Sequence, residues 1–113
     1  MGKHYLLNLY GCAFNRLNDE KYLVGLLEDA AIASGATVLK TISHKFNPQG
    51  VTAICMLSES HISIHTWPEE GKAACDIYTC GDADQRLGVI LSFINSILRT
   101  IHSVTLSVDI LRR

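Results

Sequence analysis

The segment Ser58–Gly81, SESHISIHTWPEEGKAACDIYTCG, contains two short runs of alternating apolar and polar residues on either side of the turn sequence PEEGK. In the first run, Ile62 and Ile64 alternate with histidine, serine and tryptophan side chains. Alternation with a period of two places successive side chains on opposite faces of a β-strand. The segment therefore predicts an antiparallel β-hairpin with one apolar face for the core and one polar face.

The length of the connection fixes the register of this hairpin. A four-residue connection, PEEG, sets four pairs of residues opposite each other: Trp67 and Lys72, His65 and Ala74, Ser63 and Asp76, and Glu59 and Cys80. In that register Cys80 lies beside the Glu59–Ser60 peptide bond. A five-residue connection would shift the pairing by one residue and turn Cys80 to the opposite face.

The rest of the chain predicts further strands and helices around this hairpin. We expect strands over 4–10, 36–44, 51–58 and 103–111, helices over 18–34 and 84–99, a loop at 11–19 and a turn at 45–50. Gly35 stands where a left-handed residue would end the first helix. This order favours an α+β fold, a two-layer sandwich in which a largely antiparallel sheet carries two helices on one face.

The composition indicates how the domain is organised. The 113 residues fit a single domain, residues 1–113, and 48% of them are hydrophobic, which is more than one small core requires. Because the helices cover only one face of the predicted sheet, the other face needs a different cover. We expect a second copy of the chain to provide it, so that two sheets pack face to face in a homodimer with an αββα arrangement.

Charge and apolar patterning argue against several classes of partner. The formal net charge of −1 provides no basic surface for nucleic acid or an anionic membrane. The apolar runs are far shorter than the roughly 18 residues that span a bilayer, and the first residues lack the apolar core of a signal peptide. The four cysteines form no C-x-x-C pair. These features predict a cytoplasmic protein with reduced thiols that binds neither nucleic acid nor membrane.

The polar residues of the hairpin admit more than one chemistry. Ser60 lacks the G-x-S-x-G context of a hydrolase nucleophile, and Asp76 has no defined place as an acid partner. His61 and His65 would lie about 13 Å apart along a strand, which is too far for one zinc ion with bonds of about 2 Å, so no metal site is expected. On the residues alone, hydrogen-bonded histidines, strand-face hydroxyls and a small buried cysteine explain the segment best.

A resemblance to a known family changes this interpretation. The segment closely resembles the self-processing region of the prokaryotic pyruvoyl-dependent S-adenosylmethionine decarboxylase proenzymes, and the resemblance extends to GKHYLLNLYGC, SGATVL and SHKFNPQGVTAI. It implies that the Ser60 hydroxyl attacks the carbonyl of Glu59 and that the chain cleaves itself there into residues 1–59 and 60–113. Ser60 would thereby become a pyruvoyl cofactor, whose ketone condenses with the substrate amine.

The resemblance also implies roles for five other residues. His65 matches the processing histidine and Cys80 matches the proton donor. Thr52 stands in place of the family's helper serine and keeps its hydroxyl. Phe46 matches an aromatic residue that stacks on adenine, and Glu69 matches a carboxylate that holds the ribose hydroxyls.

The implied reaction is decarboxylation of S-adenosylmethionine, which yields the aminopropyl donor for polyamine synthesis. Trp67 is a further candidate for the substrate pocket. Two residues depart from the family pattern: Asn8, where an acidic residue is frequent, and Lys72, where tyrosine is common. Because related pyruvoyl enzymes decarboxylate arginine or ornithine, these two substrates are alternatives, and an inactive regulatory homologue is a third.

Overall fold

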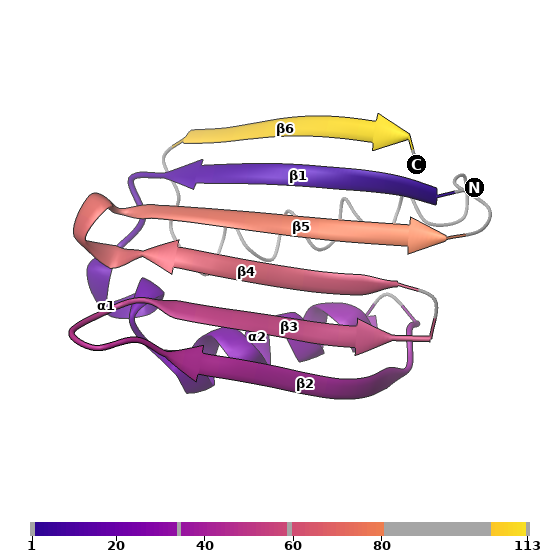
Figure 1. Ribbon diagram of the computed structural model, residues 1–113, viewed down its shortest axis with the longest axis horizontal. Helices are drawn as coiled ribbons and strands as arrows, with labels where there is room; N and C mark the ends of the chain where they lie inside the picture. The colour runs from indigo at the N-terminus through magenta and orange to yellow at the C-terminus, as the bar shows by residue number, and fades with distance from the viewer. Residues whose placement is uncertain (1, 34, 59, 81–104, 113) are drawn as a thin grey trace.

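Six β-strands form one sheet in the computed structural model, which describes residues 2–33, 35–58, 60–80 and 105–112 (Figure 1). The strands are β1 (Gly2–Tyr10), β2 (Val38–Lys45), β3 (Val51–Leu57), β4 (His61–Trp67), β5 (Lys72–Cys80) and β6 (Thr105–Arg112). Their order across the sheet is β2-β3-β4-β5-β1-β6, and each neighbouring pair is antiparallel. The predicted antiparallel sheet is therefore confirmed.

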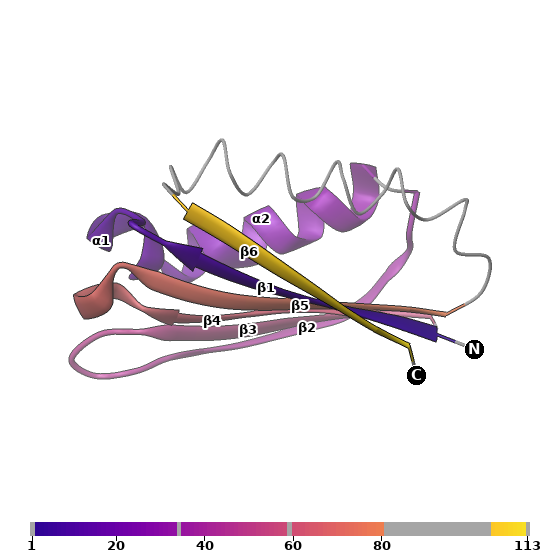
Figure 2. The ribbon, with the colours of Figure 1, turned by 90° about the horizontal axis from the view of Figure 1, so that it is seen from above.

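Helix α2 (Glu20–Ala33) and the short helix α1 (Phe14–Leu17) lie on one face of the sheet (Figure 2). The buried side chains of α2 recur at helical spacing: Leu23, Leu26, Leu27, Ala30 and Ala31. Just beyond the helix, Gly35 has a φ of 80°, which glycine adopts without strain, and its N–H donates to the carbonyl of Ile32 at 3.0 Å. The first helix and the α+β class are confirmed, while the helix predicted over 84–99 lies outside the described residues.

The segment predicted as a loop, residues 11–19, contains helix α1, so that part of the prediction was wrong. Leu17 is fully buried, and its carbonyl accepts a hydrogen bond from Oγ1 of Thr66 in β4 at 2.7 Å. The same hydroxyl oxygen accepts a hydrogen bond from the N–H of Val51 at 2.9 Å. A four-residue helix is too short to show an amphipathic repeat, and its position depends on these contacts with distant strands.

The β4–β5 hairpin has the predicted register. Three expected pairs are present: Trp67 with Lys72, His65 with Ala74, and Ser63 with Asp76. The 3₁₀ helix η1 (Pro68–Glu70) and Gly71 form the four-residue connection, so the five-residue alternative is wrong. Gly71 has a φ of 62°, and a Cβ added there would lie 3.2 Å from the carbonyl oxygen of Cys12. The expected pair of Glu59 and Cys80 lies outside the described pairing.

The two faces of the sheet differ in cover. Alternate residues of β1, β3, β4 and β5 form the core beneath α2: Tyr5, Leu7, Leu9, Val51, Ala53, Cys55, Ile62, Ile64, Ala73, Cys75 and Ile77. The opposite side, here called the open face, carries the polar residues of the hairpin and also exposes Ile42, Ile54 and Met56. Figure 2 shows α1 and α2 on the other side. Neither described helix is long and apolar enough to cross a bilayer.

Candidate active site

His65 lies on the open face of β4, beside Thr52 of β3. The strand register pairs these two residues, and Oγ1 of Thr52 lies 3.1 Å from Nδ1 of His65. Both side chains are partly buried. The hydrogen bond fixes the orientation of the imidazole ring, so that a positioned acid–base group lies next to a hydroxyl.

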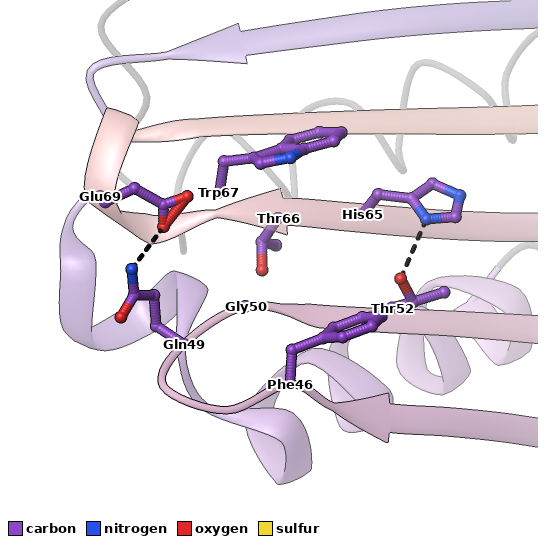
Figure 3. Close-up of a pocket in the computed structure, with 8 residues that line it drawn as sticks. All are labelled: Phe46, Gln49, Gly50, Thr52, His65, Thr66, Trp67 and Glu69. Atoms are coloured by element: carbon purple, nitrogen blue, oxygen red, sulfur yellow. Dashed lines mark hydrogen bonds between the residues drawn. The ribbon is translucent and has the colours of Figure 1, made fainter.

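A cavity of about 300 Å³ lies beside this pair (Figure 3). Its lining comes from the β2–β3 connection, parts of β3 and β4, and η1: Phe46, Gln49, Gly50, Thr52, His65, Thr66, Trp67 and Glu69. The volume falls at the lower end of the range for small-molecule sites, about 300–1,000 Å³. Five residues singled out from the sequence therefore surround one cavity: Phe46, Thr52, His65, Trp67 and Glu69.

Phe46 contributes an aromatic surface to the cavity. Its side chain is 48% exposed, and its ring packs edge to face against His44 with 4.6 Å between the ring centroids. The backbone N–H of Phe46 donates to the carbonyl of Gly50 at 2.8 Å, which closes the β2–β3 connection. A half-exposed ring on a fixed backbone can stack on a planar ligand.

Glu69 contributes an oriented carboxylate. Nε2 of Gln49, which also lines the cavity, donates a hydrogen bond to Oε2 of Glu69 at 3.0 Å (Figure 3). Carboxylate oxygens accept hydrogen bonds from hydroxyl groups such as those of a ribose. Gln49 was not predicted as a site residue, because it and Glu69 lie in separate turns and no local pattern links them.

Lys72, one of the two departures from the family pattern, acts on the cavity through Trp67. The Lys72 ammonium lies 5.2 Å from the centroid of the Trp67 ring. This separation is within the range of a cation–π contact. Lys72 therefore packs against a residue that lines the cavity and is not itself part of the lining.

Ser60 lies between β3 and β4. Its carbonyl accepts the N–H of Leu57 at 2.9 Å. Its Oγ is buried and has no hydrogen-bond partner within the described ranges of the chain. Buried hydroxyls without a partner are uncommon and are often functional. Glu59, on the other side of the expected cleavage site, lies outside the described residues.

Ser60 and His65 lie too far apart within one chain to contact each other. Five residues of extended chain separate them, so their backbones lie roughly 16 Å apart at about 3.3 Å per residue. The backbone of Cys80 pairs with Gly2, and the register of β5 puts it near the Ser60 end of β4. His65 and the cavity therefore occupy the end of β4 opposite to Ser60 and the Cys80 backbone.

A second polar group on the open face is centred on Asp76 of β5, and only its pairing with Ser63 was predicted. Ser63 donates a hydrogen bond to Oδ1 of Asp76, and Nε2 of His4 and Nε2 of His61 lie 2.6 Å and 3.2 Å from Oδ2. Burial raises the pKa of Asp76, but the hydrogen bonds from these three side chains outweigh it, so the pKa lies below its ordinary value. His4 comes from β1, so only the fold reveals this group.

Residues 3–109 match the sequence profile of S-adenosylmethionine decarboxylase. The chain belongs to this family. It is 55% identical over 82 residues to an S-adenosylmethionine decarboxylase proenzyme of Prochlorococcus marinus, a match that covers 73% of this chain and 66% of that protein. The proenzyme of Methanococcus maripaludis strain C7 is 54% identical over 82 residues, 73% of this chain and 67% of that protein.

A solved member of the decarboxylase family has the same fold. The crystal structure of the adenosylmethionine decarboxylase from Aquifex aeolicus superposes with a TM-score of 0.87 and 31% identity. The superposition covers 100% of this chain and 90% of that one. The chain spans 64–66% of the length of the first three curated relatives that it matches.

Proposed function

We propose that this chain is a self-processing, pyruvoyl-dependent S-adenosylmethionine decarboxylase that forms the aminopropyl donor for polyamine synthesis. The observation that carries the proposal is the cavity beside His65, lined by the Phe46 ring and the Glu69 carboxylate. The ring suits the adenine base and the carboxylate suits the ribose hydroxyls. Membership of the family and the proenzyme names of its relatives support the same reaction.

Processing starts at Ser60. Its Oγ attacks the carbonyl carbon of Glu59, the peptide C–N bond breaks, and an ester joins Glu59 to the Ser60 side chain. Removal of the Cα proton of Ser60 expels the Glu59 carboxylate and leaves dehydroalanine, which water converts to a pyruvoyl group and ammonia. The products are residues 1–59 and 60–113. The buried Oγ supports this step because no described hydrogen bond competes for it.

His65 moves protons during processing, and Thr52 positions it. An imidazole accepts and returns protons near neutral pH, and its effect depends on the geometry of the ring. The hydrogen bond of 3.1 Å between Thr52 Oγ1 and His65 Nδ1 supports a fixed ring. Threonine retains the hydroxyl of the family's helper serine and adds a methyl group at a partly buried position of β3.

The pyruvoyl carbonyl supplies an electron sink for the loss of carbon dioxide from the amino-acid end of the substrate. Cys80 then donates the proton that the product carbon requires. A thiol suits this role because its ordinary pKa, about 8.5, leaves it largely protonated at neutral pH. The pairing of the Cys80 backbone with Gly2, near the Ser60 end of the hairpin, supports the assignment.

A homodimer would complete the site. His65 lies roughly 16 Å from Ser60 along β4, whereas a hydrogen bond requires about 3 Å. If a second copy packs its open face across a twofold axis with its strands reversed, the partner's His65 and cavity lie near the Ser60 end of β4. The exposed Ile42, Ile54 and Met56 would provide apolar surface for this contact. We infer an αββα dimer with composite active sites.

The alternative substrates fit the cavity less well. Arginine and ornithine have neither a base nor a ribose, so they would leave Phe46 and Glu69 without a counterpart.

Asn8, one of the two departures from the family pattern, lines a second hollow beside Asp76 and Asp109. An asparagine makes this hollow less negative than an acidic residue would. This hollow shares His65 with the adenosyl cavity, but Asn8 is not among the residues that line the cavity beside Phe46 and Glu69, so the departure does not remove the fit to a nucleoside. An inactive homologue would not need Ser60, His65 and Cys80 together.

We infer a cytoplasmic location from the cysteines. Cys55 and Cys75 are buried free thiols. Burial raises the pKa of the thiols of Cys55 and Cys75, which keeps them protonated and unreactive. Structural thiols of this kind fit a reducing compartment.

Replacing Phe46 with alanine tests the nucleoside site. In Phe46→Ala the KM for S-adenosylmethionine should rise about tenfold or more, because a stacking partner of the adenine is lost, while self-cleavage continues. KM is measured from carbon dioxide release by fully cleaved protein. Phe14→Ala is the matched control, since Phe14 is an exposed phenylalanine of α1 outside the cavity. An unchanged KM in Phe46→Ala would remove this residue from substrate binding.

A further inference from the structure

Three metal-ligating side chains converge on the open face. His4 of β1, His61 of β4 and Asp76 of β5 each offer one ligand atom, and these atoms all lie within 4.8 Å of one another. Nε2 of His4 and Nε2 of His61 approach the same carboxylate oxygen, Oδ2, at 2.6 Å and 3.2 Å. All three side chains are partly exposed on the open face of a single chain, so an ion can reach them there before two chains pack together.

The strand register holds the three side chains in place. β5 lies between β1 and β4, and Tyr78 of β5 pairs with His4 on one side and His61 on the other. The Tyr78 ring stacks on His61 with 5.8 Å between centroids and meets the edge of His4 at 5.9 Å. Both imidazoles are thereby directed along β5 toward Asp76.

The separations suit a tetrahedral ion. Bonds of about 2.0–2.2 Å to nitrogen and oxygen put neighbouring ligand atoms about 3.3 Å apart. The contacts of 2.6 Å and 3.2 Å need only small side-chain adjustments to reach this value. Ser63 holds the other carboxylate oxygen of Asp76, as outer-shell partners do in metal sites.

We propose that His4, His61 and Asp76 bind a divalent transition-metal ion, of which Zn²⁺ is the best match. Two imidazoles and one carboxylate are ligands that zinc, cobalt and nickel accept. Three protein ligands leave a fourth position for water or a partner group. The expectation of no metal site was based on His61 and His65 in one strand. The proposed site takes its ligands from three strands, and no pattern within one strand reveals it.

The site has a structural consequence if Ser60 is cleaved as proposed. His61 is then the second residue of the chain 60–113 and follows the pyruvoyl group directly. An ion on His61 would anchor this new end to β1 and β5. The metal site itself depends only on His4, His61 and Asp76 and does not rest on the proposed decarboxylation.

The test is a titration of the metal-stripped full chain with Co²⁺, followed by visible absorption and by competition with Zn²⁺. We expect one ion per chain, in wild-type protein and equally in uncleaved Ser60→Ala, which separates this result from any failure of the proposed reaction. Affinity should fall more than about 100-fold in His4→Ala and in Asp76→Asn, and about 10- to 100-fold in Ser63→Ala. His44→Ala, which removes another open-face histidine, should bind like the wild type.

Two results would overturn the metal site. One is the absence of Co²⁺ uptake by folded wild-type protein, with folding checked by circular dichroism. The other is uptake that Asp76→Asn leaves unchanged. The Asp76→Asn variant is nearly isosteric and keeps hydrogen-bonding capacity, so it separates loss of a ligand from loss of the fold. If His4→Ala does not fold, His61→Ala provides the second ligand deletion.

Discussion

In Ser60→Ala the chain should remain in one piece, with the mass of all 113 residues and no fragment after long incubation. The reason is chemical, because alanine has no oxygen to attack the carbonyl of Glu59. Denaturing mass spectrometry measures the result, and in wild-type protein it should show residues 1–59 and a pyruvoyl form of residues 60–113. All decarboxylation should be lost with the cleavage.

Ser58→Ala provides the control for Ser60→Ala, since Ser58 is an exposed serine two residues away. This variant should be cleaved like the wild type. Removing the Ser60 Oγ should leave the uncleaved chain folded, because no described hydrogen bond is lost. Cleaved Ser60→Ala protein, or cleavage at another bond in the wild type, would show that Ser60 is not the precursor.

Two inactive variants should restore cleavage when they are produced together. Ser60→Ala lacks the nucleophile and His65→Ala lacks the processing histidine, so neither should complete processing alone. In a mixed dimer with composite sites, one site has both residues intact. That site combines Ser60 of the His65→Ala chain with the partner's His65, and so only the His65→Ala chain should be cleaved.

The expected size of this rescue is large. Random pairing of equal amounts puts about half of each chain into mixed dimers, so about half of the His65→Ala chains should be cleaved. Tags of different mass on the two variants identify which chain is cut. Ser60→Ala produced with Phe14→Ala controls for the co-production, since Phe14→Ala retains both processing residues: all Phe14→Ala chains and no Ser60→Ala chains should be cleaved. No cleavage of the His65→Ala chain in purified mixed dimers would contradict a composite site.

The sequence predicted the hairpin because its information is local. Alternating side chains fixed the two faces of β4, and the PEEG connection fixed its pairing with β5 through η1 and Gly71. Helix α1 escaped prediction because four residues show no period and because its position depends on Thr66. Sequence patterns predict an element well when its geometry depends on neighbouring residues. They fail when a contact with a distant segment determines where the element lies.

The candidate site could likewise be predicted only in part, because some of its contacts join distant segments. Resemblance to the family picked out Phe46 and Glu69, and both line the cavity beside His65. It did not find Gln49, which holds the Glu69 carboxylate, or His4, which reaches Asp76 from β1. These contacts join segments far apart in the chain, and no spacing within the sequence encodes them.

Ser60 and His65 are close in the sequence but far apart in one chain. Five residues are a short interval along the chain, but in an extended strand they span roughly 16 Å. A motif can therefore identify residues of one active site although they lie apart in one subunit. The distance, read together with the exposed apolar residues of the open face, is what favours a second copy of the chain.

The most direct measurement is carbon dioxide release by fully cleaved protein from carboxyl-labelled S-adenosylmethionine, arginine and ornithine, assayed side by side. We expect release from S-adenosylmethionine and none above the Ser60→Ala background from the two amino acids, because only the nucleoside substrate has partners for Phe46 and Glu69. Release from arginine or ornithine, with none from S-adenosylmethionine, would contradict the assignment.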